Sequence, residues 1–190
     1  MQTTATSAAR SPRPIATAPR TLHPTVTLLG AEVVDAATLA ESLGDQRWFG
    51  VLRAHSALVR ERFVAHGGEV VRSQGDGFLV SFPSVRQALS CAIDVQRTLV
   101  SRRADDPGTD LRVRLGVHSG EVIAADGDLF GRNVELTSKI ASEAAADEIL
   151  VSAVTKQLAD AGGDLYFGAG RPTSLRDVPG EWVLHALEWS

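Results

Sequence analysis

The sequence contains one cysteine, one methionine and one tyrosine among its 190 residues, and only 5% of its residues are aromatic. Because Cys91 is alone, no disulfide can form within the chain, and its apolar surroundings predict a small core residue. No stretch approaches about 18 consecutive apolar residues, so we expect no membrane-spanning helix. A formal net charge of −4 argues against a generally basic nucleic-acid-binding surface.

Several motifs of common enzymes are also missing. The sequence has no Walker loop for nucleotide phosphates and no Gly-x-Ser-x-Gly nucleophile motif. Its five histidines do not show the spacing of metal ligands. With 44% hydrophobic and 22% charged residues, the composition is that of an ordinary globular protein.

The first 24 residues differ from the rest of the chain in composition. They contain four prolines, no acidic residue and many Ser, Thr and Ala residues. Such a segment has too little apolar surface to offset the entropy lost on ordering, so we expect a disordered leader at residues 1–24. It lacks the apolar region of a secretion signal, and we expect a cytoplasmic protein whose single domain spans residues 25–190.

Hydrophobic spacing in the remaining chain indicates a mixed succession of strands and helices. The clearest helix has one apolar face from Val85 to Leu99, and the clearest strand alternates from Leu111 to His118. We also expect strands at 25–33, 121–124, 148–151, 165–167 and 182–187, a hairpin at 69–82, a turn-rich loop at 126–131, and helices at 36–43, 46–66, 133–145 and 152–161. This order predicts an α+β, ferredoxin-like fold with helices packed on a mostly antiparallel sheet.

Residues 69–82 are the stretch that points to chemistry. Two apolar runs flank Gly75-Asp76-Gly77, and glycine on both sides of an aspartate favours a tight hairpin turn. Such a turn holds the Asp76 carboxylate at its tip, and a hard divalent cation prefers fixed oxygen ligands of this kind. The alternative is an ordinary surface hairpin without a ligand.

Four stretches resemble the catalytic domain of class III adenylate and guanylate cyclases. Residues 71–78 look like the Lys-x-x-Gly-Asp-Gly turn of that family, and residues 114–122 look like its Arg-Ile-Gly-Ile-His-x-Gly strand pair. Residues 127–134 are similar to the loop and helix start before its Val-Asn-x-Ala-x-Arg motif. Residues 148–152 are similar to its late Glu-Ile-Leu-Val-Ser strand, and the resemblance covers residues 25–188.

The resemblance implies a head-to-tail homodimer with active sites between the protomers. It also implies two divalent metal ions per site, Mg2+ or Mn2+. The implied reaction is attack of the ribose 3′-oxygen of a nucleoside triphosphate on the α-phosphate, with release of pyrophosphate. Two metals would lower the pKa of the attacking hydroxyl and neutralise the phosphates, and a cation must stabilise the α-phosphate in the transition state.

The two metal-binding carboxylates of the family fall on Glu32 and Asp76. Asp76 matches, whereas Glu32 stands where the family has Asp, and its additional methylene moves the oxygens by about 1.5 Å. A misplacement of ~1 Å can cost about 100-fold in rate. Gly30 stands where the family usually has Phe. The alternative role of Glu32 is a surface carboxylate at the end of a strand.

The base-reading positions of the family fall on Arg72 and Asp128. Asp128 matches the residue that accepts a hydrogen bond from the adenine amino group, and Arg72 replaces a Lys with a larger, fork-shaped cation. Because a guanine-specific site more typically has Glu at position 72, adenine is the favoured base. The alternative role of Arg72 is a surface cation on the hairpin.

The two catalytic helix positions depart furthest from the family. Its ribose-positioning Asn falls on Glu135 and its transition-state Arg falls on Lys139, and the spacing of four keeps both on one helix face. Lys139 retains a cation without the bidentate fork, and Glu135 adds a negative charge where a polyphosphate would lie. Alternatively, the two side chains form an i, i+4 salt bridge with no part in catalysis.

Three functional hypotheses follow. The first is a divergent class III nucleotidyl cyclase, a phosphorus–oxygen lyase that converts ATP to cyclic AMP and pyrophosphate as a homodimer, with no nucleic-acid or membrane partner. The second is a catalytically degenerate cyclase-homology domain that binds a nucleotide or dimerises as a regulatory module. The third is a cyclase for a pyrimidine or another unusual nucleotide, since the base-reading pair is altered.

Overall fold

The computed structural model describes residues 22–105 and 111–190, which form one seven-stranded sheet, a separate two-stranded hairpin and helices. The strands are β1 (Thr25–Val33), β2 (Glu69–Gln74), β3 (Gly77–Phe82), β4 (Val113–Glu121), β5 (Ile123–Ala125), β6 (Asp128–Phe130), β7 (Ile149–Ser152), β8 (Arg171–Ser174) and β9 (Glu181–Ala186). The helices are α1 (Ala36–Leu43), α2 (Asp45–Ala65), α3 (Val85–Asp105), α4 (Arg132–Glu143), α5 (Ala153–Ala159) and a short 3-10 helix, η1 (Asp160–Gly162). None of the helices in the described ranges is long and apolar enough to cross a membrane.

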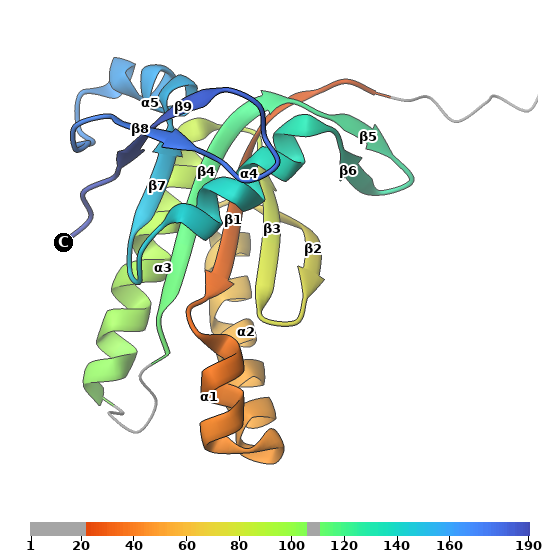
Figure 1. Cartoon of the computed structure of the whole chain (residues 1–190), viewed down its shortest axis with the longest axis vertical. Coiled ribbons are helices and arrows are strands. Elements are labelled where there is room, and N and C mark those ends of the chain that lie inside the picture. Colours follow the sequence, from red (N-terminus) through yellow and green to blue (C-terminus); the bar gives the residue numbers. More distant parts are fainter. Residues whose placement is uncertain (1–21, 106–110) are drawn as a thin grey trace, which may run out of the picture.

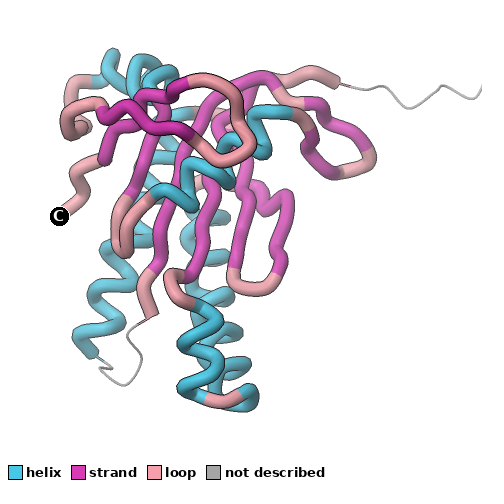
Figure 2. The backbone as a smooth tube through the Cα atoms, viewed as in Figure 1, coloured by secondary structure: helices cyan, strands magenta, loops and turns pink. Residues whose placement is uncertain are grey.

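The large sheet has the strand order β2-β3-β1-β4-β7-β9-β8, and all of its pairs are antiparallel except that between β4 and β7. Figure 1 shows α4 crossing the front of the sheet, with α2 and α3 behind it. Figure 2 shows the same arrangement as a sheet between two layers of helix. The predicted α+β class with a mostly antiparallel sheet is confirmed.

Strand β1 separates two packing layers through the alternation of its side chains. Leu29, Ala31 and Val33 lie in the main hydrophobic core, to which α2 and α3 contribute. The positions between them, Gly30 and Glu32, lie on the α4 side of the sheet, where both contact residues of that helix. The Glu32 side chain is therefore available to a site on the α4 face.

Two glycines allow α4 to lie close to the sheet. Gly30 of β1 pairs with Gly116 of β4, and a Cβ atom added to Gly116 would lie 2.6 Å from the Cα atom of Ala141. A Cβ atom on Gly30 would lie 3.3 Å from the Ala141 Cβ and 3.4 Å from the carbonyl oxygen of Thr137. A side chain larger than a methyl group at position 30 would require α4 to move away from the sheet, so glycine suits this close packing.

Three predicted segments need correction. The loop expected at residues 126–131 contains β6, which pairs with β5 in a hairpin. The strand expected at residues 165–167 is reduced to a single bridge between Phe167 and Leu187. Strand β8 is absent from the sequence prediction, because its sequence Arg-Pro-Thr-Ser lacks alternating apolar residues and its partly exposed backbone pairs only with β9.

The described chain begins near the end of the segment expected to be a leader. Residues 1–21 of that segment lie outside the described residues. Leu22 forms a backbone bridge with Ala124 of β5, and the Val122 amide donates to the carbonyl oxygen of Pro24 at 2.9 Å. Residues 22–24 are therefore held against the start of the β5–β6 hairpin.

Candidate active site

The sheet places the two expected metal-binding carboxylates at one end of adjacent strands. Ala31 of β1 pairs with Phe78 of β3 in antiparallel register. Glu32 follows Ala31 directly, and Asp76 precedes Phe78 by two positions, in the turn between β2 and β3. The hairpin is the one that the sequence predicts, with Gly75 in the left-handed region at a φ of 60°. The register therefore brings both acidic positions to the same end of the β1–β3 pair.

The Glu32 carboxylate is held by an arginine of the neighbouring strand. Arg114 lies directly opposite Glu32 in the β1–β4 register, and its Nε and Nη2 atoms donate to Glu32 Oε2 at 3.0 and 2.8 Å. The remaining nitrogen, Nη1, donates to the carbonyl oxygen of Ser142 at 2.9 Å. The Ser142 hydroxyl lies 3.2 Å from Glu32 Oε1. Arg114 thus joins β1, β4 and the last turn of α4.

The sequence places Arg114 on the polar face of its strand but does not by itself reveal its partner. The signal that identifies the partner is the antiparallel register, because opposite charges at facing positions of adjacent strands form cross-strand pairs. The Glu32 and Arg114 side chains are 29% and 30% exposed, so water screens the ion pair only in part.

The fit of these residues to a divalent metal ion depends on Glu32. In the described ranges, no cluster of three or more His, Cys, Asp or Glu side chains is arranged to hold a metal ion. Asp76 is half-buried at the hairpin tip and forms no ion pair with another described residue. Its carboxylate fits Mg2+ or Mn2+, whereas Glu32 fits such an ion only after release from Arg114. Metal binding by Glu32 and Asp76 remains a prediction.

The two expected base-reading residues contact each other. Arg72 Nε donates to the Asp128 carboxylate oxygens at 3.0 and 3.2 Å, and Arg72 Nη2 donates to the carbonyl oxygen of Leu129 at 2.6 Å. The guanidinium carbon lies 5.6 Å from the centre of the Phe130 ring. Hydrogen bonding from Arg72 is the main reason that the pKa of Asp128 lies below its ordinary value. Arg72 is therefore an anchor of the β5–β6 hairpin, and base reading by the pair remains a prediction.

A bulge in β2 precedes Arg72. Val70 pairs with Val80 and Arg72 pairs with Leu79, so Val71 is an additional residue in β2. A one-residue shift of this kind moves the following side chains to the other face of a strand.

Asp128 also borders a groove of about 430 Å³ between β1, β2 and the β5–β6 hairpin.

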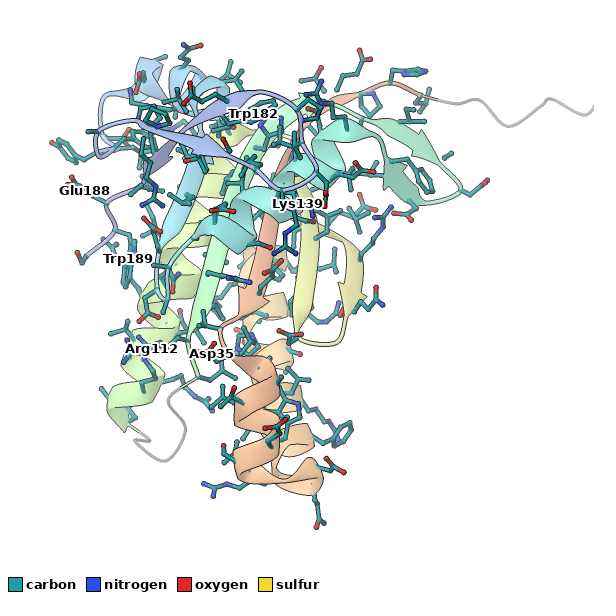
Figure 3. All side chains as sticks on the ribbon, viewed as in Figure 1. Asp35, Arg112, Lys139, Trp182, Glu188 and Trp189 are labelled. Carbon is teal, nitrogen blue, oxygen red and sulfur yellow. The ribbon has the colours of Figure 1, made fainter. Side chains whose placement is uncertain are left out.

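Glu135 and Lys139 lie on α4, but the alternative salt bridge between them is absent from the ion pairs of the described residues. The Lys139 ammonium instead lies 3.5 Å from a carboxylate oxygen of Asp177, between β8 and β9. Glu135 is exposed in the first turn of α4. Figure 3 shows Lys139 on α4, with Trp182 of β9 above it. Because Asp177 is 78% exposed, its pair with Lys139 is weak and leaves the ammonium able to contact an anion.

A buried chain of hydrogen bonds, which the sequence does not reveal, fixes the start of α4. His118 of β4 lies 2.9 Å from Asn133 Oδ1 through Nε2 and 2.8 Å from Ser152 Oγ through Nδ1. The Asn133 amide nitrogen donates to the Glu121 carbonyl oxygen, so Oδ1 is the acceptor and His118 Nε2 is the donor. Burial lowers the pKa of His118. A neutral histidine therefore ties the helix that carries Glu135 and Lys139 to β4.

A second buried histidine lies within electrostatic reach of the hairpin tip. His55 of α2 is 7% exposed, and its Nδ1 atom has no hydrogen-bond partner in the described structure. Burial lowers the pKa of His55 to about 4, and the Asp76 carboxylate acts in the opposite direction. His55 is thus neutral at pH 7.

A family model and one curated relative match most of the chain. The model, described as the adenylate and guanylate cyclase catalytic domain, matches residues 19–183. An uncharacterized protein of Mycobacterium tuberculosis is 30% identical over 136 residues, which cover 70% of this chain and 45% of that protein. The chain therefore spans less than half the length of this relative.

Two solved structures share the fold of the chain. Adenylyl cyclase CyaB from P. aeruginosa has a TM-score of 0.80 at 19% identity, covering 90% of this chain and 97% of that chain. Guanylyl cyclase Cya2 has a TM-score of 0.79 at 21% identity, covering 88% of this chain and 93% of that chain. An adenylyl and a guanylyl cyclase are thus similarly close in fold, and the fold alone does not distinguish ATP from GTP.

Proposed function

Since the chain belongs to the adenylate and guanylate cyclase catalytic domain family, we propose that it is a divergent nucleotidyl cyclase that converts ATP to 3′,5′-cyclic AMP and pyrophosphate. The observation that carries this proposal is the placement of Glu32 and Asp76 at one end of the β1–β3 pair. Carboxylates held on a strand and in the tight turn beside it are suited to divalent cations that accompany a triphosphate.

In the proposed reaction the ribose 3′-oxygen attacks the α-phosphorus. The bond from the α-phosphorus to the oxygen that bridges to the β-phosphate breaks, pyrophosphate leaves, and the hydroxyl proton passes to solvent. Bound Mg2+ or Mn2+ would lower the pKa of the ribose 3′-hydroxyl and neutralise negative charge on the phosphates. The remaining requirements, which are orientation of the nucleotide and positive charge at the α-phosphate, belong to side chains of the chain itself.

Arg72 and Asp128 are proposed to orient the base. Asp128, which is paired with Arg72, borders a groove of about 430 Å³, within the size range of small-molecule sites, about 300–1,000 Å³. Asp128 is held in its charged form by Arg72, so it can accept a hydrogen bond from the amino group of adenine. This acceptor supports ATP as the substrate.

Lys139 and Glu135 are proposed to face the phosphates and ribose from α4. Lys139 supplies positive charge, because its pair with the exposed Asp177 is easily broken. Glu135 stands in the first turn of the helix and would repel the phosphates, which predicts slow turnover.

A homodimer is proposed as the active unit. The β5–β6 hairpin presents two apolar side chains to solvent, Ile123 at 39% and Phe130 at 44% exposure. Exposed apolar side chains next to a candidate site favour burial against another protein surface, here a second copy of the chain. This arrangement agrees with the head-to-tail dimer that the sequence resemblance implies.

The proposed function is tested by incubating the purified chain with each of the four common nucleoside triphosphates and Mn2+, followed by mass analysis of the products. We expect cyclic AMP and pyrophosphate from ATP. Asp76→Asn should abolish the product, while Asp45→Asn, an exposed carboxylate at the start of α2, should not. No cyclic nucleotide above a no-enzyme control from any of the four substrates would exclude catalysis, and a cyclic pyrimidine product would favour the unusual-nucleotide hypothesis.

The Glu32–Arg114 ion pair favours a second candidate, a regulatory domain that binds nucleotide or dimerises without catalysis. The two candidates are distinguished by restoring the residues of the family through Glu32→Asp, Arg72→Lys, Glu135→Asn and Lys139→Arg together. Strong activity gained from a silent parent would favour the regulatory domain. An active parent chain excludes it.

A further inference from the structure

We propose that Arg114 is an internal competitor of the metal ion: its guanidinium holds the Glu32 carboxylate in place of a divalent cation, and a cation binds at Glu32 only when this ion pair opens. The inference rests on the proposed function in one respect, the assumption that position 32 is a metal-ligand position. It differs from the proposed function in naming what must be displaced before the metal binds.

The first support is the occupation of the Glu32 oxygens. Oε2 accepts hydrogen bonds from two nitrogens of Arg114, at 2.8 and 3.0 Å, and the Ser142 hydroxyl lies 3.2 and 3.3 Å from the two oxygens. Mg2+ would require one of these oxygens at about 2.1 Å. A cation bound to either oxygen would lie close to the positive guanidinium and be repelled by it, so metal binding and the ion pair with Arg114 oppose each other.

The second support is the length of the Glu32 side chain. Arg114 occupies a position where the resembled family also has Arg, whereas Glu32 replaces its Asp. An Asp at this position would withdraw the carboxylate by about 1.5 Å, the length of one carbon–carbon bond. Contacts of 2.8 and 3.0 Å would then exceed the hydrogen-bond range of about 3.2 Å. Glu32, which departs from the family, is therefore long enough to form the ion pair with Arg114, whereas an Asp at this position is not.

The third support is that Arg114 is fixed from a second direction. Its Nη1 atom donates to the carbonyl oxygen of Ser142, in the last turn of α4. Carbonyl groups in the last turn have no partner within the helix, and a cation is favoured there. The guanidinium is consequently positioned against Glu32 before any metal arrives.

The test is a calorimetric titration of nucleotide-free protein with Mn2+. Glu32→Asp, which retains Arg114 but shortens the carboxylate, should bind Mn2+ at least about tenfold more tightly than the wild type, since charged hydrogen bonds no longer have to be broken first. Arg114→Met should show a similar gain. Adding Glu32→Gln to Arg114→Met should remove the gain, because the freed carboxylate is its source.

A matched control is Arg171→Met, which removes the guanidinium of another arginine–glutamate pair, 3.0 Å from Glu148, and should leave Mn2+ affinity unchanged. Equal Mn2+ affinity of the wild type, Glu32→Asp and Arg114→Met overturns the proposal, as does undetectable binding in all three. If Arg114→Met is unfolded by circular dichroism, Glu32→Asp decides the question. The titration contains no triphosphate, so its result does not depend on cyclase activity. A gain in Mn2+ affinity can be observed in a chain that has no cyclase activity, and the gain can be absent from a chain that is an active cyclase.

Discussion

Arg72 and Asp128 are 56 positions apart in the chain, and 3.0 Å separates the Nε atom of one from the Oδ1 atom of the other. The pair connects β2 to the β5–β6 hairpin at the edge of the groove proposed for the base. Since the two side chains are 43% and 35% exposed, water screens their attraction, and the pair contributes little to the overall stability of the fold. Removing the pair should therefore leave the fold intact, so a role in ligand recognition can be tested separately from stability.

The first prediction concerns Asp128→Asn, which removes the negative charge and keeps the shape. We expect the free energy of unfolding in urea to stay close to the wild-type value, because the pair is exposed. The Kd for ATP with Mn2+ should rise about tenfold, since the base loses a charged acceptor. Asp45→Asn, an exposed carboxylate at the start of α2 and away from the groove, is the control and should alter neither quantity. Equal ATP affinity in the two variants would contradict a base-reading role for Asp128.

The second prediction concerns the approach of α4 to the sheet. Gly116→Ala places a Cβ atom 2.6 Å from the Ala141 Cα atom, and backbone cannot move away as a flexible side chain can. Overpacking of this kind should lower the free energy of unfolding by about 1–3 kcal/mol. Gly50→Ala in α2 has no atom within 4 Å of the added Cβ and should raise stability by up to about 1 kcal/mol. Urea unfolding of both variants tests the expected opposite signs.

The sequence is sufficient for features that depend on neighbouring residues. Strand β1 spans the nine residues, Thr25–Val33, that its β-branched and apolar run predicts, and the turn at Asp76 follows from the glycines beside it. Local propensity and turn chemistry act over a few positions, so they can be recognised without knowledge of the tertiary structure.

Features that depend on the register of distant strands could not be predicted in this way. The Glu32–Arg114 pair joins residues 82 positions apart, and it requires the β1–β4 register that the final sheet provides. Lys139 pairs with Asp177 rather than with Glu135, because the turn before β9 returns to α4. The candidate site is therefore predictable as a set of positions, while the partners of its charged side chains depend on the tertiary structure.

The third prediction concerns the pH dependence of stability. Burial lowers the pKa of His55 from 6.5 to about 4 in the folded chain, so the unfolded chain binds more protons between these values. The free energy of unfolding should therefore decrease as pH falls below about 6.5, by about 2 kcal/mol at pH 5. Burial lowers the pKa of His118 as well and acts in the same direction.

The variant that isolates this contribution is His55→Leu. Since His55 Nδ1 has no partner in the described structure, the substitution loses no hydrogen bond from that atom. Urea unfolding at about pH 7.5 and about pH 5 should show a smaller loss of stability in His55→Leu than in the wild type, by about 2 kcal/mol. His23→Gln, which changes an exposed histidine, should keep the wild-type dependence. Identical pH dependence in wild type and His55→Leu would refute the assignment.

The last prediction concerns Glu135, whose charge lies on the helix that also carries Lys139. If phosphates bind beside α4, a carboxylate in its first turn repels them by about 1 kcal/mol at a separation near 4 Å in water. Glu135→Asn should then lower the Kd for ATP with Mn2+ about fivefold. Because Glu135 is exposed, stability should change by less than about 0.5 kcal/mol.

The control for this effect is Glu143→Gln, which removes an exposed carboxylate at the other end of the same helix and should leave the ATP affinity unchanged. Higher salt should reduce the difference between wild type and Glu135→Asn, since screening weakens repulsion between exposed charges. A Glu135→Asn variant with unchanged ATP affinity at low salt would place the phosphates away from α4. In that case Lys139 would have no catalytic role either, because its ammonium lies on the same helix, four positions from Glu135.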